Sequence, residues 1–462
     1  MTHFCPAYPK PRVSKASAWR MFFSARRSWL DALYERSYSM QVGEVHLPGV
    51  NLYMVNKPSL VKRILETDSE AFPKSKLLGR ALKPLLGESI FTTSGKQWRK
   101  QRQMMDPAFA QTRLTAAYPQ MAAAVQDMLL RLADLPDGAE YDFEAEMTHV
   151  TADIIFRTIF SSSLQSADAR RIFFAFARYQ AIAPRLLLPS IYNLSWLVWP
   201  WDIWNSRQAA AEIRGLLAAF IRPRYLSYTK GEPQDCNDIL QSFIQARSAE
   251  TGEGFSFDEL VDQVAMLFLA GHETSASALT WAVYMLANSR DIQERMHLEV
   301  TQQLQQRKPD ASDIRYFSLT RNVFKEALRL FPPVGFMARQ SSNACPMDDK
   351  VLEKNDTVVV SPWLIHRHRL AWMNPDAFNP DRFDEEASKQ ALKDAYLPFG
   401  MGPRVCLGAA FALQEATLIL ASLVRDYRFL PVAGHEPQPV GRLTIRSANG
   451  VRLTLHQRRL AA

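Results

Sequence analysis

The most informative stretch of this chain is Phe399-Gly400-Met401-Gly402-Pro403-Arg404-Val405-Cys406-Leu407-Gly408. It combines one cysteine with three glycines, an aromatic residue and an arginine. Backbone N–H groups stabilise a thiolate, glycines let the chain approach a flat macrocycle, and an arginine can neutralise a carboxylate of that macrocycle. The stretch is therefore typical of a loop that binds haem through a cysteine thiolate. The alternative is a glycine-rich turn that precedes a helix and contributes one cysteine to the core.

The spacing of five of these residues resembles the haem-binding loop of the cytochromes P-450, namely Phe399, Gly402, Arg404, Cys406 and Gly408. By this resemblance Cys406 is the proximal axial ligand of the haem iron, and Arg404 pairs with a haem propionate. Residues 407–425 contain good helix formers in an apolar pattern, so we expect Cys406 at the start of a helix. The positive end of that helix favours a thiolate over a thiol.

A second segment predicts one very long helix with polar residues at its centre. Ser256-Phe257-Asp258-Glu259 is a capping box, and apolar or small residues continue without proline to about Asn288. A helix of ~32 residues would be roughly 48 Å long. Its middle reads Ala270-Gly271-His272-Glu273-Thr274-Ser275. Glycine and a carboxylate are both costly inside a buried helix, so we interpret this run as a site; a kinked helix with a solvated polar patch is the alternative.

The same run resembles the oxygen-activation segment of the central distal helix of the cytochromes P-450. The resemblance implies that Ala270 and Gly271 leave space above the haem. It also implies that Glu273 and Thr274 organise the water chain that protonates bound dioxygen. We do not expect His272 to bind the iron, because the family tolerates many residues at this position and a distal histidine would block oxygen chemistry.

Two further motifs support the resemblance. Glu326 and Arg329 share one face of a predicted helix, and Phe378-Asn379-Pro380-Asp381-Arg382-Phe383 resembles the meander motif of the family, with aspartate in place of the commoner glutamate. The resemblance implies a buried structural triad of Glu326, Arg329 and Arg382, held by charge-assisted hydrogen bonds.

Trp98 and Arg102 lie four residues apart on a predicted helix and match the family's pattern for holding a haem propionate. An exposed basic helix is the alternative interpretation of that motif. Arg339 is a further propionate candidate by its position in the family. His366 and His368 could suggest a metal pair, but no third ligand lies nearby, so we expect a structural or surface role for them.

Length and composition favour one large globular unit. The 462 residues are 47% hydrophobic and 22% charged, and no linker, repeat or low-complexity run divides them. We expect a single catalytic domain over residues 1–462, and the about 56 residues after Cys406 leave no room for a fused reductase. Four widely spaced cysteines and an N-terminus without a long apolar run predict a cytoplasmic protein without a transmembrane anchor. We expect a monomer.

The formal net charge of +8 could indicate nucleic acid, anionic lipid or an acidic protein as the partner. No nucleic-acid-binding motif accompanies it. By the resemblance, Lys96, Arg99 and Lys100 lie on the side of the molecule where electrons enter. The expected electron source is therefore an acidic ferredoxin or flavodoxin with its reductase.

Residues 191–204 contain Trp196, Trp199, Trp201 and Trp204. By position in the family this segment is the loop between two lid helices that admit substrate. Buried packing, the mouth of an apolar channel and a peripheral membrane contact all remain open. Four apolar residues fall where family members line the pocket, and they predict a hydrophobic substrate that is fatty-acid-like or terpenoid: Leu85, Leu86, Phe336 and Met337.

The resemblance implies a mainly α fold with small β-sheets, the triangular prism of the cytochromes P-450, with haem b bound between the long helix and the cysteine loop. The implied activity is a monooxygenase that inserts one oxygen atom of O2 into a hydrophobic substrate. The alternatives are a peroxide-using or isomerising haem-thiolate enzyme and a non-enzymatic haem sensor.

Overall fold

The computed structural model describes residues 3–14, 28–47, 50–165, 167–191, 198–233, 236–305 and 307–458. Its helices are α2 (Pro58–Lys62), α3 (Lys76–Leu86), α4 (Gly95–Met105), α5 (Gln111–Ala133), α6 (Phe143–Phe160), α7 (Ala167–Ile191), α8 (Pro200–Thr229), α9 (Ile239–Gln245), α10 (Phe257–Ala287), α11 (Arg290–Leu304), α12 (Ser318–Leu330), α13 (Pro362–Ile365), α14 (Lys389–Ala395) and α15 (Ala409–Asp426). Its strands are β1 (Val42–Leu47), β2 (Val50–Val55), β3 (Ala139–Asp142), β4 (Met337–Gln340), β5 (Cys345–Met347), β6 (Lys350–Leu352), β7 (Thr357–Val360), β8 (Tyr427–Pro431), β9 (Pro439–Gly441), β10 (Ile445–Ser447) and β11 (Arg452–Gln457).

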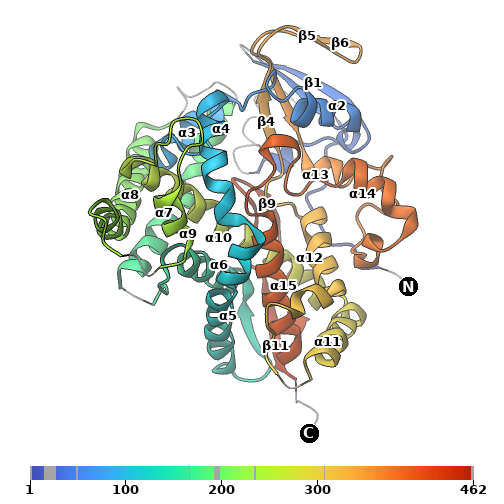
Figure 1. Cartoon of the computed structure of the whole chain (residues 1–462). Coiled ribbons are helices and arrows are strands. Elements are labelled where there is room, and N and C mark those ends of the chain that lie inside the picture. The colour runs from blue at the N-terminus through green and yellow to red at the C-terminus, as the bar shows by residue number, and fades with distance from the viewer. Residues whose placement is uncertain are drawn as a thin grey trace.

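The long helix α10 runs through the centre of the molecule (Figure 1). Its capping box is confirmed: the Ser256 hydroxyl accepts from the backbone N–H of Glu259, and the Glu259 carboxylate accepts from that of Ser256. Helices α6, α8, α12 and α15 all pack against it. Because neighbours surround it, α10 is apolar on most faces rather than on one stripe.

The strands form small sheets at the edges of this helical body, as the mainly α prediction requires. One sheet has the order β1-β2-β7-β4, with β2 and β7 parallel and the other pairs antiparallel. A second has the order β3-β11-β8, and β9 pairs with β10. Figure 1 shows β1, β5 and β6 at one end of the molecule and α5 and α11 toward the other. Strands β4 and β10 matter most, because they carry site residues.

Glu326 of α12 forms the centre of a fully buried ionic cluster. Its carboxylate accepts from Arg329 Nε and Nη2 at 2.7 and 2.8 Å and from Arg382 Nε at 2.9 Å. Both guanidinium groups also donate to the Ala377 carbonyl. Burial raises the pKa of Glu326, but the charges of the two arginines lower it below the ordinary value overall. The cluster ties α12 to the segment that leads to the cysteine loop, which is a structural role.

One hydrophobic core extends from Trp29 to Leu455 and includes α10, α12 and α15. A smaller cluster lies under the β1-β2-β7-β4 sheet and includes Phe72, Trp372 and Leu397. The cysteine loop, residues 399–408, connects these two clusters, since Phe399 packs on the first and Met401 on the second. A loop that is anchored on both sides can present a side chain at a defined position.

Candidate active site

The cysteine loop depends on one glycine for its shape. Gly402 has φ +70°, and a Cβ built there would lie 2.2 Å from the Leu65 carbonyl oxygen. A larger residue would therefore displace the loop from the short helix at Arg63–Thr67. The backbone N–H of Cys406 donates to the Phe399 carbonyl at 2.9 Å, which closes the loop. A Cβ built on Gly408 would meet nothing within 4 Å, so the space beside it is open.

Cys406 lies just before α15, whose N-cap is Gly408. Surrounding protein raises the pKa of the thiol, whereas the Gly408 N–H and the positive charge of Arg102 lower it. Part of the side chain nevertheless stays exposed. A soft metal ion bound at the exposed part of the side chain would stabilise the thiolate that burial disfavours.

Three cations gather near the loop: Lys74, Arg339 on β4, and Arg404. Lys74 and Arg339 pair in an isolated β-bridge. Desolvation and the charges of Arg404 and Arg339 lower the pKa of Lys74 well below its ordinary value, and desolvation lowers the pKa of both arginines to about 10. Within the described ranges none of the three pairs with a carboxylate, and Arg404 Nη1 is buried without a hydrogen-bond partner. Clustered, uncompensated cations indicate a site for an anion with more than one negative charge.

The other two propionate candidates are Trp98, which contacts the cation cluster, and Arg102, which contacts the backbone of the cysteine loop. The Arg404 guanidinium stacks over the Trp98 ring, 4.4 Å from its centroid, so Trp98 positions a member of the cation cluster. Arg102 instead donates from Nε to Asp106 at 2.6 Å and from Nη1 to the Val405 carbonyl at 2.7 Å. It therefore braces the backbone beside Cys406 and is already paired with a carboxylate.

The centre of α10 has two solvent-accessible residues next to a buried run. All of residues 260–269 are buried, yet Ala270 is exposed and Thr274 half-exposed, although helices surround this part of α10. The Thr274 hydroxyl donates to the Ala270 carbonyl at 2.7 Å. At Gly271, a Cβ would lie 2.9 Å from Ile155 Cγ1. Its missing side chain permits the close packing of α6 on α10.

Glu273 is held by an ion pair that sequence reasoning missed. Its Oε1 accepts from Thr444 Oγ1 at 2.5 Å and from Arg446 Nε at 3.1 Å. Its Oε2 accepts from Arg446 Nη2 at 2.7 Å and from Gln180 Nε2 at 2.5 Å. Burial would raise the pKa of Glu273, but the charge of Arg446 and these hydrogen bonds lower it to about 2. Glu273 is thus a fully ionised, fully bonded carboxylate. Nothing in the local sequence around Glu273 signals a partner from β10.

Two of the histidines considered above, His272 and His366, are buried and hydrogen-bonded. His272 is buried, with Nδ1 2.6 Å from the Phe268 carbonyl and Nε2 3.2 Å from Gln180 Nε2. His366 Nδ1 contacts the Arg329 carbonyl, and its Nε2 accepts from the Leu397 N–H at 2.9 Å. Both ring nitrogens of each residue are therefore engaged. No group of three or more metal-ligating side chains occurs among the residues that the structure describes.

For the tryptophan segment, the structure excludes one of the three interpretations given above, buried packing, at the described residues. Trp199, Trp201 and Trp204 are 70%, 67% and 52% exposed, so buried packing is wrong for them. Trp201 and Trp204 lie in the first turns of α8 rather than in a loop, and their rings stack at 5.0 Å. Trp196 lies outside the described residues. Among the expected pocket residues, Leu85 and Leu86 are buried and Phe336 and Met337 half-buried.

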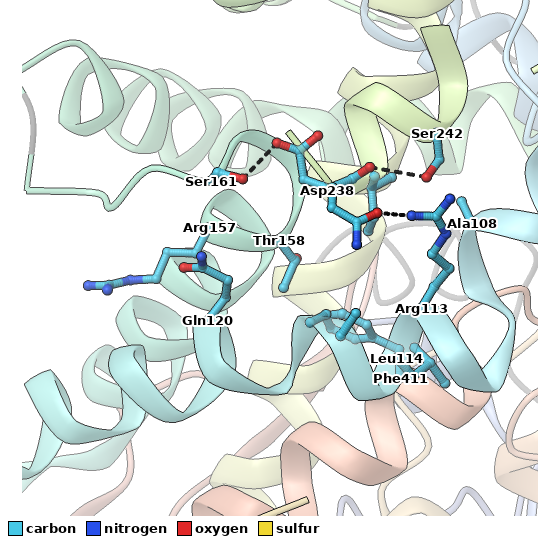
Figure 2. Close-up of a pocket in the computed structure, with 14 residues that line it drawn as sticks. Ala108, Arg113, Leu114, Gln120, Arg157, Thr158, Ser161, Asp238, Ser242 and Phe411 are labelled. Atoms are coloured by element: carbon cyan, nitrogen blue, oxygen red, sulfur yellow. Dashed lines mark hydrogen bonds between the residues drawn. The ribbon is translucent and has the colours of Figure 1, made fainter. Parts of the chain in front are cut away.

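A separate cavity of about 190 Å³ opens between α5, α6 and α9 (Figure 2). Several of its polar groups are hydrogen-bonded: Ser161 donates to Asp238, which also pairs with Arg224, and Arg113 donates to Asn237. None of the candidate residues above lines it. We therefore do not regard it as the active site.

The residues fit haem. Its iron matches the Cys406 thiol, its two propionates match the cluster of Lys74, Arg339 and Arg404, and its flat ring matches the open sides of Gly408 and Ala270. A mainly helical fold with a cysteine loop at the start of a helix and a central helix beside it defines the class of haem-thiolate proteins.

The comparisons identify the family. The model of the cytochrome P450 family matches residues 30–451. The chain belongs to the cytochrome P450 family, and it is a haem b-containing monooxygenase. No described helix has the length and apolar character needed to span a membrane.

Relatives of this chain include two proteins of Streptomyces melanosporofaciens. Cyclooctatin synthase is 30% identical over 409 residues, which cover 86% of this chain and 84% of that protein. Cyclooctat-9-en-7-ol 5-monooxygenase is 29% identical over 394 residues, or 85% and 83% of the two chains. The solved haem domain of cytochrome P450DA superposes with a TM-score of 0.80 at 24% identity, covering 91% and 90%, and supports the fold.

Proposed function

We propose that this enzyme hydroxylates an apolar, terpenoid-like ring compound, with electrons from a separate small acidic carrier. The observation that carries the substrate class is the similarity to two bacterial proteins, one named for oxidation of an unsaturated ring alcohol at carbon 5. The apolar character of Leu85, Leu86, Phe336 and Met337 agrees with such a substrate. A fatty-acid-like compound is the second substrate class to test.

In this proposal each group of residues has one role. Cys406 binds the iron, the cluster of Lys74, Arg339 and Arg404 binds the propionates, and Arg102 braces the loop backbone at Val405. When bound, the haem supplies the activation of O2 and the oxidation of a C–H bond. Thr274 positions water beside the substrate through its hydroxyl, and Ala270 leaves room for substrate and O2.

The electron carrier would dock on the exposed basic residues of α4. Lys96, Arg99 and Lys100 lie at the surface of this helix, whose next turn carries Arg102 against the cysteine loop. An acidic ferredoxin or flavodoxin complements this charge. We propose in addition that residues 1–462 act as one catalytic domain in the cytoplasm, where the four free cysteines stay reduced. The exposed tryptophans of α8 would provide a peripheral contact with lipid.

The test combines spectroscopy with product analysis. The reduced protein should give the carbon monoxide difference band of a thiolate-ligated haem, and Cys406→Ala should lose it. With a surrogate ferredoxin and reductase, ring terpenoid alcohols should gain one oxygen atom from isotopically labelled O2, while fatty acids of equal carbon number should react more slowly. Product that forms only with added peroxide, or that carries unlabelled oxygen, would contradict the proposal in favour of the peroxide-using alternative.

A further inference from the structure

The cavity between α5, α6 and α9 has no part in the proposed function. Its volume is about 190 Å³, and Figure 2 shows lining residues from several helices around it. Pockets for drug-sized compounds measure about 300–1,000 Å³. This cavity therefore suits a smaller compound, with a single ring or a short chain.

One part of the lining is apolar. It consists of buried side chains from the short helix Asp106–Phe109, from α5, from α9 and from α15: Ala108, Leu114, Ile239 and Phe411. Apolar surface of this kind favours a ligand that brings a hydrocarbon portion out of water.

Two of the three charged residues that line the cavity are neutralised by ion pairs. Arg157 pairs with Asp127 and Asp153, and Figure 2 shows its guanidinium group pointing away from the other labelled residues. Asp238 accepts from both terminal nitrogens of Arg224, at 2.7 and 2.8 Å. Neither residue leaves a net charge for a ligand.

Arg113 is the third charged residue, and its charge is not compensated. It is half-buried on α5 and donates from Nη1 to the side-chain oxygen of Asn237, and no carboxylate in the described part of the chain pairs with it. The amide of Gln120 also lines the cavity and has no hydrogen-bond partner among the described residues. A guanidinium group binds a carboxylate through two parallel hydrogen bonds, and an amide adds a further donor. The unmatched groups thus favour an anion with one negative charge.

We propose that this cavity binds a small monocarboxylate with an apolar body. Arg113 and Gln120 hold the carboxylate, and Leu114 and Phe411 contact the apolar body. The inference goes beyond the proposed function, because none of the residues that have a role in that function is among the described residues lining the cavity.

The walls of the cavity adjoin the cysteine loop on two sides. Ala108 belongs to the short helix Asp106–Phe109, whose first residue pairs with Arg102 of α4. Arg102 donates to the backbone of the loop. Phe411 lies on α15, the helix that directly follows the loop. A bound acid would therefore contact two elements next to the iron ligand without entering the substrate site.

The experiment titrates 4-fluorobenzoate into the holoprotein and follows the fluorine NMR signal, with imidazole present to occupy the open side of the haem iron. We expect saturable binding with a Kd of about 1 mM or tighter, as is ordinary for a compound of this size. The neutral compound 4-fluorobenzamide has the same shape and should bind about tenfold or more weakly, because it lacks the charge that Arg113 recognises.

Three variants locate the site. Arg113→Gln should weaken binding of 4-fluorobenzoate about tenfold or more, and Ala117→Leu, which places a larger side chain in the cavity, should abolish saturable binding. Arg170→Gln removes the same charge from an exposed position on α7 and should bind like the wild type.

Absence of saturable 4-fluorobenzoate binding overturns the proposal, and so does equal affinity for the acid and the amide. Undiminished binding in Arg113→Gln or in Ala117→Leu also overturns it, because the compound then binds elsewhere. A wild type that binds 4-fluorobenzoate in this way but oxidises no ring terpenoid contradicts the proposed function and leaves the carboxylate site supported.

Discussion

Glu273 and Arg446 show how strongly one side chain can depend on a residue far along the chain. Both side chains are nearly buried. Both carboxylate oxygens of Glu273 accept hydrogen bonds, from Arg446, Thr444 and Gln180. The ion pair joins α10 to β10, and Arg446 Nη1 continues it to Thr148 on α6. Three segments are thus held together beside the oxygen-activation segment by one charge pair.

Glu273→Gln should destabilise the protein by about 3–5 kcal/mol, because it leaves Arg446 buried without a counterion. The wild-type pKa of about 2 lies below the ordinary value, so the ion pair stabilises fully above about pH 4.5 and progressively less as the pH falls toward 2. Urea unfolding of both proteins over this pH range measures the effect. The double variant Glu273→Gln with Arg446→Met should recover part of the loss; an additive further loss would contradict the assignment.

At the scale of elements, α4 joins the surface to the cysteine loop. Its exposed Arg99 and half-exposed Lys100 pair with Glu70 and Glu253, and Arg102 donates to the Val405 carbonyl. Exposed ion pairs of this kind contribute little to stability. The helix can therefore exchange these partners for the carboxylates of a docking protein at small cost.

Charge reversal of Lys96, Arg99 and Lys100 to glutamate should slow the first electron transfer from an acidic ferredoxin by about tenfold or more at low salt, and less as salt screens the charges. Stopped-flow reduction measures this rate. The control reverses three exposed cations on other elements, Arg170, Arg290 and Lys308, with the same change in net charge. Equal slowing in both variants would show a long-range charge effect and not a docking site on α4.

The start of α8 presents the other functional surface. Replacement of Trp199, Trp201 and Trp204 by serine should leave the unfolding free energy nearly unchanged, because the three rings are mostly exposed. We expect binding to lipid vesicles in a sedimentation assay to fall about tenfold or more, since tryptophan favours the interface. Unchanged vesicle binding with a raised KM for substrate would instead assign the patch to the mouth of the channel.

At the scale of the whole molecule, the proposed haem site consists of elements that the fold brings together from distant positions in the chain. Lys74, Arg339 and Arg404 come from three separate segments; desolvation lowers the pKa of all three, and the charges of neighbouring arginines lower the pKa of Lys74 and Arg404 further. The folded chain therefore holds this charge cluster at a cost that a dianionic group offsets. Haem binding should therefore raise the free energy of unfolding of this protein, in addition to supplying its chemistry.

Lys74→Met should accordingly have opposite effects on the two forms of the protein. The haem-free form should gain about 1 kcal/mol of unfolding free energy, because a desolvated cation is removed, while the haem should dissociate about tenfold faster because a charged hydrogen bond is lost. Denaturant unfolding measures the free energy of unfolding, and haem transfer to an acceptor protein measures the rate of haem dissociation. Lys83→Met, at an exposed lysine paired with Glu88, is the control and should change neither. A destabilised haem-free Lys74→Met protein would contradict the anion site.

Local patterns were predictable because the residues that interact lie close together in the chain. The capping box involves Ser256 and Glu259, and the cysteine loop is closed by a hydrogen bond between residues less than ten positions apart. Glu326 and Arg329 lie one helical turn apart, and Arg382 carries a recognisable motif around it. Gly271 shows the limit of such local patterns, because the residue that a side chain there would meet is Ile155, on another helix and far away in the sequence.

The sequence by itself determined the long central helix, because its capping box and apolar run are properties of neighbouring residues. Through the resemblance of short motifs to a known family, it also predicted the haem-thiolate loop and the mainly α fold. Only the tertiary structure decided the protonation states of the acids on and beside that helix. Glu273 loses its proton because β10 places Arg446 beside it, whereas burial against Ser275, with no cation paired to it among the described residues, raises the pKa of Glu415 to about 8. Protonation depends on desolvation and on charges brought near by folding, and neither is encoded in the residues next to a carboxyl group.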